Sequence, residues 1–354
     1  MKPDSLILLT LIFLVSLSST PAEVAGNPGQ VTVLVSGQGA PHGVAIADGY
    51  VYWADYWAAS DRGTVNRIPL QGGNATVLVA ERGQPENVAV DDGFVYWTDY
   101  EAGFVGRVEV TGGTPEIIAT QQDRPWSILV HDGFVYWSEL LVGNIRRAPV
   151  GGGPVEYVVQ GRAGIPSFVI EGNNIYWAEG FIQGSSESQI GTVALNGGSP
   201  RKFVNSLKPW SLVIESGYLY WTEYRMGLVK KVSLEGGPVQ LIQSEGIFFD
   251  QYDIAADSQS VYWTEPRGNI ESIPLAGGPV LTLATNRTGR PYGIASDGVH
   301  LVWTEDLGGN VVLYTLHEES SWNQPIYLAL EGAALALIGI AIVLRKFRPS
   351  KRKH

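Results

Sequence analysis

The stretch Phe94–Asp99, with the sequence FVYWTD, decides the fold because similar hexapeptides recur along the whole chain. Each copy is built around a tryptophan, and tyrosine precedes six of the seven. Successive tryptophans are 44, 40, 40, 44, 42 and 40 residues apart: Trp53, Trp97, Trp137, Trp177, Trp221, Trp263 and Trp303. A period of about 40–45 residues is typical of the four-stranded blades of a β-propeller. The spacing therefore predicts an all-β, seven-bladed β-propeller over residues 23–316.

The second unit shows how one blade is built from four short strands. An apolar strand at Asn87–Val90 is expected nearest the axis, and Asp92-Gly93 follows it. This dipeptide tolerates the positive φ angles that a tight hairpin needs. The other three strands are expected at Phe94–Asp99, Gly103–Val110 and Pro115–Thr120. A glycine pair, Gly112-Gly113, separates the last two strands, and six of the seven units contain such a pair.

The seventh unit lacks the glycine pair and supplies only three strands, at Pro291–Ala295, Leu301–Glu305 and Val311–Leu316. The segment Val31–Ser36, VTVLVS, resembles the outer strand Thr76–Ala80, TVLVA, of the first unit. We therefore expect the N-terminal strand to complete the last blade. Such pairing closes the ring and leaves no exposed strand edge.

The repeated aromatic and acidic residues are expected to be structural. A tryptophan on the second strand can fill the gap between neighbouring blades, where its burial removes about 150–250 Å² from water. At about 25 cal/mol per Å², this burial is worth about 4–6 kcal/mol before opposing terms. An acid follows every motif: Asp55, Asp99, Glu139, Glu179, Glu223, Glu265 and Glu305. Acids spread around a ring cannot converge on one ion, so we expect hydrogen bonds to adjacent backbone, Thr or Ser groups.

The two ends of the chain carry the signs of export and of a membrane anchor. Residues 1–22 combine Lys2, an apolar run and small residues near Ala22, which is typical of a cleaved signal peptide. An uncleaved anchor is the alternative. Residues 326–344 form an apolar segment of 19 residues, long enough for about 28 Å of helix. The basic tail that follows, residues 345–354, favours the cytoplasmic side of a membrane.

These ends predict a single-pass protein of the cell membrane, with the propeller on the extracytoplasmic side. Residues 317–325 would form the linker, and residues 326–344 the transmembrane helix. A buried core helix and a processed C-terminal sorting tail are the alternatives for the second apolar segment.

The composition excludes several classes of function. The chain of 354 residues has no cysteine, which excludes disulfides, thiol nucleophiles and Cys-ligated metal sites. Residues 23–325 contain 17 Lys and Arg against 33 Asp and Glu. This excess of negative charge repels nucleic acid, so no nucleic-acid partner is expected. The sequence also contains no Gly-x-Ser-x-Gly, HExxH or phosphate-loop motif.

The motif resembles the YWTD repeat of the low-density-lipoprotein-receptor family over about residues 31–316. Tyr96–Asp99 matches its four letters, while Tyr220–Glu223 and Tyr262–Glu265 end in glutamate. The chain is also similar to bacterial propellers with Tyr-Trp-Thr and Gly-Gly repeats. The receptor propellers have six blades and Cys-rich flanking modules, whereas this chain has seven units and no cysteine. The resemblance implies a binding platform with its ligand on one face, and the receptor's own ligands are not transferred.

Ligand binding is expected on the face that carries the variable loops. The Asp-Gly and Gly-Gly turns lie on one face, the turn face. The leading prolines and the loops after each Tyr-Trp lie on the other, the loop face. The residue after each leading proline, or its counterpart, is expected near the axis: His42, Glu86, Trp126, Ser167, Trp210, Tyr252 and Tyr292. The candidate ligand-binding residues are His42, Glu86, Trp126, Trp210, Tyr252 and Tyr292. The alternative is that the aromatic members only plug the channel.

Three functions are compatible with these features. A binding or adhesion module would recognise an extracellular protein, peptide or glycan and would need no cofactor. An extracytoplasmic hydrolase or lyase could instead use a metal in the channel, with His42, Glu86 and Asp253 as candidate ligands. A purely structural envelope protein is the third. The aromatic residues and the absence of catalytic motifs favour the binding module.

Overall fold

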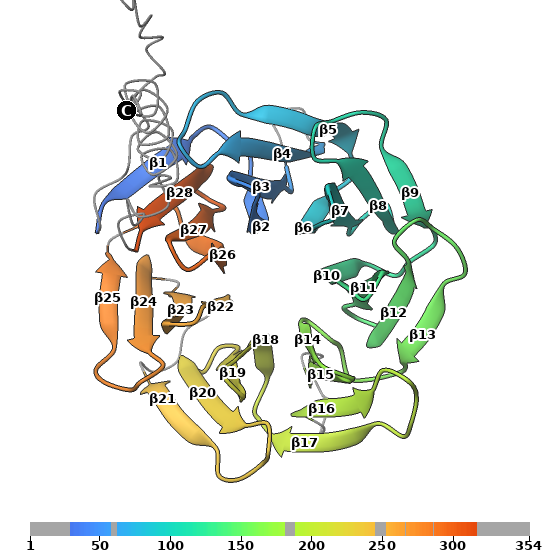
Figure 1. Ribbon diagram of the computed structural model, residues 1–354, viewed down its shortest axis with the longest axis vertical. Helices are drawn as coiled ribbons and strands as arrows, with labels where there is room; N and C mark the ends of the chain where they lie inside the picture. The colour runs from blue at the N-terminus through green and yellow to red at the C-terminus, as the bar shows by residue number, and fades with distance from the viewer. Residues whose placement is uncertain are drawn as a thin grey trace, which may run out of the picture.

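The computed structural model describes residues 29–57, 62–180, 188–244, 253–265, 267–285 and 287–316. These residues form seven four-stranded antiparallel sheets arranged around a central axis (Figure 1). The described part of the chain contains strands and turns but no helix. The structure therefore confirms the all-β, seven-bladed propeller predicted from the tryptophan spacing.

Each blade places its first strand nearest the axis and its fourth strand at the rim. The first strands are β2 (Pro41–Ala47), β6 (Pro85–Asp91), β10 (Pro125–His131), β14 (Phe168–Glu171), β18 (Pro209–Glu215), β22 (Ile254–Ala256) and β26 (Pro291–Ser296). The second strands carry the motif and are β3 (Tyr50–Asp55), β7 (Phe94–Asp99), β11 (Phe134–Glu139), β15 (Asn174–Glu179), β19 (Tyr218–Glu223), β23 (Ser260–Glu265) and β27 (His300–Glu305). The third strands are β4 (Gly63–Pro69), β8 (Phe104–Glu109), β12 (Asn144–Pro149), β16 (Gln189–Ala194), β20 (Leu228–Ser233), β24 (Asn269–Pro274) and β28 (Asn310–Thr315). The outer strands are β5 (Thr76–Arg82), β9 (Glu116–Ala119), β13 (Glu156–Val159), β17 (Arg201–Asn205), β21 (Gln240–Ser244), β25 (Leu281–Ala284) and β1 (Val31–Val35).

The second blade follows the predicted strand order. β7 has the predicted bounds, whereas β6 begins at Pro85 and is longer than the predicted Asn87–Val90. The extra residues include Pro85 and Asp91, which pair with Asp99 and Phe94, because sheet pairing does not need the apolar side chains on which the prediction relied. The turn between β6 and β7 has φ angles of 43° at Asp92 and 77° at Gly93. These angles confirm the hairpin turn predicted from the Asp-Gly pair.

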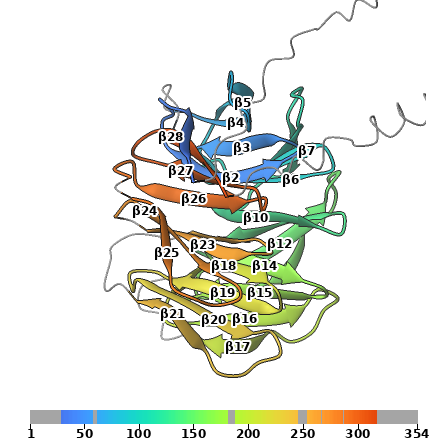
Figure 2. The same ribbon diagram turned by 60° about the vertical axis from the view of Figure 1, so that its left-hand side comes forward.

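The N-terminal strand closes the ring. β1 pairs antiparallel with β28, with Val31 opposite Tyr314 and Val33 opposite Val312. Blade seven therefore has the strand order β1-β28-β27-β26, with β1 at its rim (Figure 1). In Figure 2 the sheets of blades seven, six and five follow one another as stacked layers. The predicted closure is confirmed, and every blade has a neighbour on both sides.

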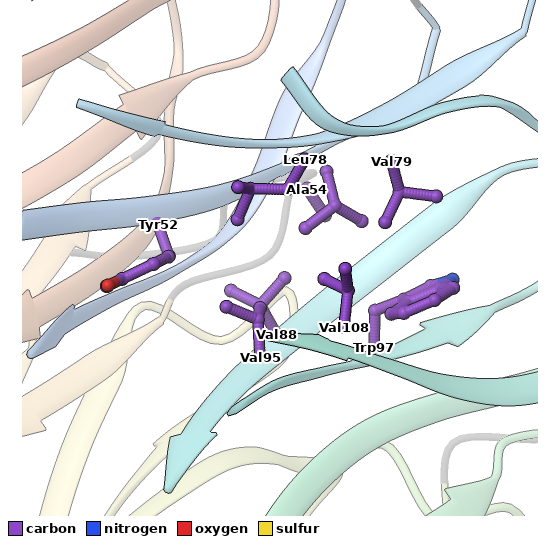
Figure 3. Packing of buried hydrophobic residues seen from close by; sticks show 9 residues of the cluster. Tyr52, Ala54, Leu78, Val79, Val88, Val95, Trp97 and Val108 are labelled. Atoms are coloured by element: carbon purple, nitrogen blue, oxygen red, sulfur yellow. The ribbon is translucent and has the colours of Figure 1, made fainter. Parts of the chain in front are cut away.

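Neighbouring blades pack through the motif tryptophans. Trp97 and Val95 of β7 form one apolar cluster with Ala54 and Leu78 of blade one (Figure 3). Similar clusters join the other blades. All seven motif tryptophans are at most 1 % exposed. Each blade is therefore held by apolar packing on both sides, in a chain that has no disulfide.

Several predicted segments lie outside the described residues. These are the signal peptide (1–22), the linker (317–325), the transmembrane helix (326–344) and the basic tail (345–354), together with Tyr252 of the candidate site. Within the ranges that the structure describes, no helix has the length and apolar character needed to cross a membrane.

We expect Trp137→Ala to lower the free energy of unfolding by about 3–5 kcal/mol, because removal of a buried indole leaves a cavity between two blades. Trp57→Ala is the matched control, since 54 % of that side chain is exposed, and should cost less than about 1 kcal/mol. Chemical denaturation followed by circular dichroism measures both. A loss below about 1 kcal/mol for Trp137→Ala would contradict its packing role.

Candidate ligand-binding site on the loop face

A β-bulge follows the leading proline in five of the first strands. In β10, Pro125 pairs with Glu139 but Ile128 pairs with Trp137, so one extra residue lies on β10 between the two pairs. The same irregularity occurs in β2, β6, β18 and β26. A bulge turns a side chain away from the regular alternation of a strand. The bulged positions include five of the six predicted site residues, namely His42, Glu86, Trp126, Trp210 and Tyr292, although the sequence analysis did not predict the bulges.

The hydroxyl group of the second-strand threonine bonds to the first strand of its own blade and to a bulged residue of the next blade. Thr98 Oγ1 accepts a hydrogen bond from the N–H of Asn87 at 3.2 Å and donates to the carbonyl of Trp126 at 2.8 Å. Equivalent bonds to the next blade run from Thr264 to Tyr292 at 3.2 Å and from Thr304 to His42 at 2.6 Å. The motif threonine therefore fixes the backbone of a site residue in the neighbouring blade.

The motif acids fix the loops that lead into the first strands. Asp55 accepts hydrogen bonds from the N–H groups of Gly39 and Ala40 at 3.0 and 2.7 Å. Asp99 accepts one from the N–H of Gln84 at 3.0 Å. Glu139 and Glu223 bind the N–H groups of Asp123 and Leu207 in the same way. These contacts confirm the predicted backbone bonds of four acids, whereas Glu179 and Glu305 bind side chains.

Two cavities lie at the axis and on the loop face. The axial channel has a volume of about 180 Å³, and the loop-face pocket has about 490 Å³. Glu86, Trp126 and Tyr292 line both cavities and therefore lie between them. The loop-face pocket is defined by these three and by His42, Tyr56, Trp57, Tyr100, Arg290 and Asp306. These residues come from blades seven, one, two and three.

A hydrogen-bonded cluster surrounds the carboxylate of Glu86, which is 2 % exposed. His42 Nδ1 lies 3.0 Å from Glu86 Oε2, and the Tyr292 hydroxyl donates to Glu86 Oε1 at 3.1 Å. The imidazole of His42 is stacked between Tyr56 and Tyr292, with ring centroids 4.6 and 4.2 Å away. Among the described residues, no lysine or arginine pairs with Glu86, and His42 is its one partner that could carry a positive charge. The cluster joins blades seven, one and two.

An aromatic band continues from this cluster across the loop face. The band consists of Tyr56, Tyr100, Trp126, Trp210 and Tyr224. Its successive ring centroids are 6.5, 5.6, 6.1 and 5.3 Å apart. The first three contacts are strongly tilted or edge-on, with interplanar angles of 50°, 77° and 79°. Such arrangements are the favoured geometries of aromatic pairs.

The structure brings most of the predicted site residues together. His42, Glu86, Trp126 and Tyr292 line the loop-face pocket, and Trp210 lines the axial channel. Ser167 also lines the channel, and Tyr252 lies outside the described residues. Sequence reasoning missed the ion pair on the pocket wall, where Arg290 Nε donates to Asp306 at 2.8 and 3.0 Å. Its only sequence signal is that Arg290 precedes a leading proline and Asp306 follows a motif acid.

The three residues suggested as metal ligands are not brought together as a metal-binding group. Asp253 lines the channel and accepts hydrogen bonds from the Ser211 hydroxyl at 2.6 Å and the N–H of Ile294 at 3.0 Å. Burial raises the pKa of Asp253. His42 lies in the other cavity. Over the described ranges, no group of three His, Asp or Glu residues could hold a metal ion.

The tyrosines of the cluster have raised pKa values. Burial raises the pKa of Tyr56 and of Tyr292, and the negative charge of Glu86 raises both further. Burial also raises the pKa of Tyr100, where the nearby Arg124 opposes the shift. These phenols therefore remain protonated hydrogen-bond donors well above neutral pH.

We expect the protein to lose stability as the pH rises above about 10, the ordinary tyrosine pKa. The unfolded chain releases phenolic protons there, whereas the folded protein retains those of Tyr56 and Tyr292, so ionisation favours unfolding. Urea unfolding between about pH 9 and 11, with phenolate absorbance recorded in parallel, measures the effect. The double variant Tyr56→Phe, Tyr292→Phe should show a smaller decline. An equal decline in both proteins would show that these two phenols do not contribute.

These features define the class of protein: a seven-bladed β-propeller with an aromatic pocket, containing a buried carboxylate, on its loop face. No protein-family model and no curated protein matches the chain. Virginiamycin B lyase from Staphylococcus aureus is similar in structure at 16% identity and a TM-score of 0.65, over 81% of this chain and 99% of the enzyme. A catalytically inactive variant of that enzyme with quinupristin gives 16% identity and a TM-score of 0.67 over the same shares. A streptogramin B lyase gives 14% identity and a TM-score of 0.65, over 80% of this chain and 96% of that one.

At 14–16% identity, these similarities show the fold alone. They agree with the seven blades seen in the structure. Membership of the YWTD family stays a prediction from the motif, because no family model supports it.

Proposed function

We propose that the chain is an extracytoplasmic binding or adhesion propeller that captures an extracellular protein, peptide or glycan on its loop face. The aromatic band carries this proposal, because its rings come from four blades and cross the mouth of the channel beside a pocket of about 490 Å³. Aromatic rings supply a large apolar contact area at a low cost in conformational entropy. A rigid scaffold with aromatic residues on one face suits recognition of an external ligand.

The exposed fractions support ligand contact rather than plugging alone. Trp210 is 6 % exposed and fills space beside Trp126. Trp57, at the rim of the loop-face pocket, is 54 % exposed and contacts Tyr56 at 5.3 Å between centroids. An indole that only filled space would be covered by protein. The loop face therefore combines a buried indole in the axial channel with an accessible indole at the rim of the loop-face pocket.

The two ends of the chain belong to the same proposal. Residues 1–22 would direct export, residues 326–344 would anchor the chain in the membrane, and residues 345–354 would stay in the cytoplasm. β28 starts beside the loop face and ends at Thr315 on the turn face. The linker, residues 317–325, would then place the turn face toward the membrane. The loop face would point outward, where an external ligand can reach it.

We expect the double variant Trp126→Ala, Trp210→Ala to lose capture of any ligand found by screening the full-length protein against glycan and peptide arrays. These two indoles form the centre of the aromatic band, so their loss removes contact area from both cavities. Tyr157→Ala is the control, because Tyr157 is exposed on the outer strand β13. Circular dichroism verifies that each variant is folded. Unchanged affinity of a folded double variant would refute the proposed site.

A hydrolase or lyase is the second candidate, and one specific observation favours it. His42 Nδ1 is bound to the Glu86 carboxylate, and the other ring nitrogen, Nε2, has no hydrogen-bond partner among the described residues. A carboxylate that orients a histidine leaves the opposite nitrogen able to take a proton from a substrate. The similar solved structures include lyases, although at an identity that shows the fold alone.

Quinupristin, the compound present in one of these similar structures, discriminates between the two candidates. The full-length protein is incubated with quinupristin, and conversion of the compound is followed by liquid chromatography coupled to mass spectrometry, which also separates a product of unchanged mass. A binding propeller leaves the compound intact. Product formed by the wild type, lost in His42→Ala and retained in His300→Ala, would favour the lyase. His300 serves as control because it pairs with Asp297 beside the turn between β26 and β27.

A further inference from the structure

We propose that the loop-face pocket recognises the alkylammonium group of a cationic ligand. This inference rests on the proposed binding function and adds the chemical class of the ligand. It is carried by the charge of the pocket lining, the arrangement of the aromatic rings and the burial of one carboxylate.

The charged residues that line the pocket leave one negative charge without a permanent cation. Arg290 and Asp306 neutralise each other through hydrogen bonds from Nε, at 2.8 and 3.0 Å, and from Nη2 of the guanidinium. Glu86 is paired with His42 and Tyr292. With His42 neutral, the described lining residues carry a formal charge of −1. The negative charge of this carboxylate attracts an ammonium group whether or not that group carries N–H donors.

The aromatic rings form walls rather than a single stack. Tyr56 is inclined by 51° to Trp57 and by 50° to Tyr100, and Trp126 stands edge-on to Tyr100. Rings inclined in this way can present several π-faces to one bound group, and ammonium ions bind to such faces. Two rings of the band already have arginine side chains of the protein itself over them. The guanidinium carbons of Arg124 and Arg225 lie 5.8 and 5.0 Å from the ring centroids of Tyr100 and Tyr224.

The negative charge of Glu86 acts on two tyrosines of the pocket. It adds to the effect of burial on the pKa of Tyr56 and of Tyr292, whose rings lie on either side of His42. Both rings line the pocket. An ammonium group placed beside these rings in the pocket would therefore meet an attractive electrostatic potential.

Other ligand classes fit the pocket less well. An anionic ligand would place a second negative charge near a carboxylate that is 2 % exposed, which is costly in a partly dehydrated site. A neutral glycan could stack on the exposed ring of Trp57, but its affinity would not depend on the charge of Glu86. Dependence on that charge is therefore the property that separates a cationic ligand from a neutral one.

Choline and its neutral isostere 3,3-dimethylbutan-1-ol test the proposal, because they share a shape and differ in charge. Both are titrated calorimetrically into the full-length protein in a polyoxyethylene detergent. We expect choline to bind at least about tenfold more tightly than the isostere. Glu86→Gln should weaken choline binding by at least about tenfold and leave the isostere unchanged.

The matched control is Glu101→Gln, the same substitution at an exposed acid that lies beside Tyr100 and outside the lining of the pocket. It should change choline affinity by less than about twofold, because an exposed charge is screened by water. Thermal melts verify that each variant is folded. The proposal is overturned if choline does not bind, if the isostere binds equally well, or if Glu86→Gln and Glu101→Gln have equal effects.

A short peptide with a single lysine distinguishes two sources of the ammonium group. Tighter binding of the peptide than of choline would assign the group to a polypeptide, and tighter binding of choline would assign it to a small molecule. Either result supports an ammonium site. A neutral ligand from the arrays that is lost in the tryptophan double variant, without choline binding, would overturn this inference and leave the proposed function standing. Absence of any ligand from the arrays would count against the proposed function itself.

Discussion

The hydroxyl bond between neighbouring blades is the interaction on which the candidate site depends. A threonine on the second strand of one blade donates to the carbonyl of the site residue in the next, as Thr304 does for His42 and Thr98 for Trp126. The bonds of Thr98 and Thr304 also include the N–H of a first-strand residue in their own blade. The bulges of β10 and β26 are therefore fixed from both sides, so the repeat that builds the ring also positions side chains at its centre.

The buried tryptophans make this positioning rigid. Trp97 packs between the sheets of two blades, and the other six motif tryptophans are equally buried. Because β1 closes the last blade, no blade can move outward without separating two packed surfaces. The side chains on the loop face are thus held by a closed ring, and a ligand would meet a preorganised surface.

The cluster around Glu86 differs from the repeated structure that supports it. Four motif acids bind the loops within their own blades, whereas Glu86 links Tyr292 of blade seven with His42 of blade one. It therefore contributes a buried carboxylate that the repeat does not use for its own backbone. A group of this kind, beside aromatic rings and a cavity, is where chemistry beyond folding is expected.

The sequence by itself determined the architecture, because each blade is specified by a local pattern. The tryptophan spacing, the Asp-Gly turns and the resemblance of Val31–Ser36 to an outer strand were enough to predict seven blades and their closure. The repeat also predicted that His42 and Trp126 would lie near the axis, since equivalent positions of a ring converge. Only the tertiary structure decided which of them touch. The bond between Tyr292 and Glu86 joins positions 206 residues apart, and the Arg290–Asp306 pair depends on loop conformation. No local pattern encodes such contacts, because they form only when the ring closes and the bulges set the direction of each side chain.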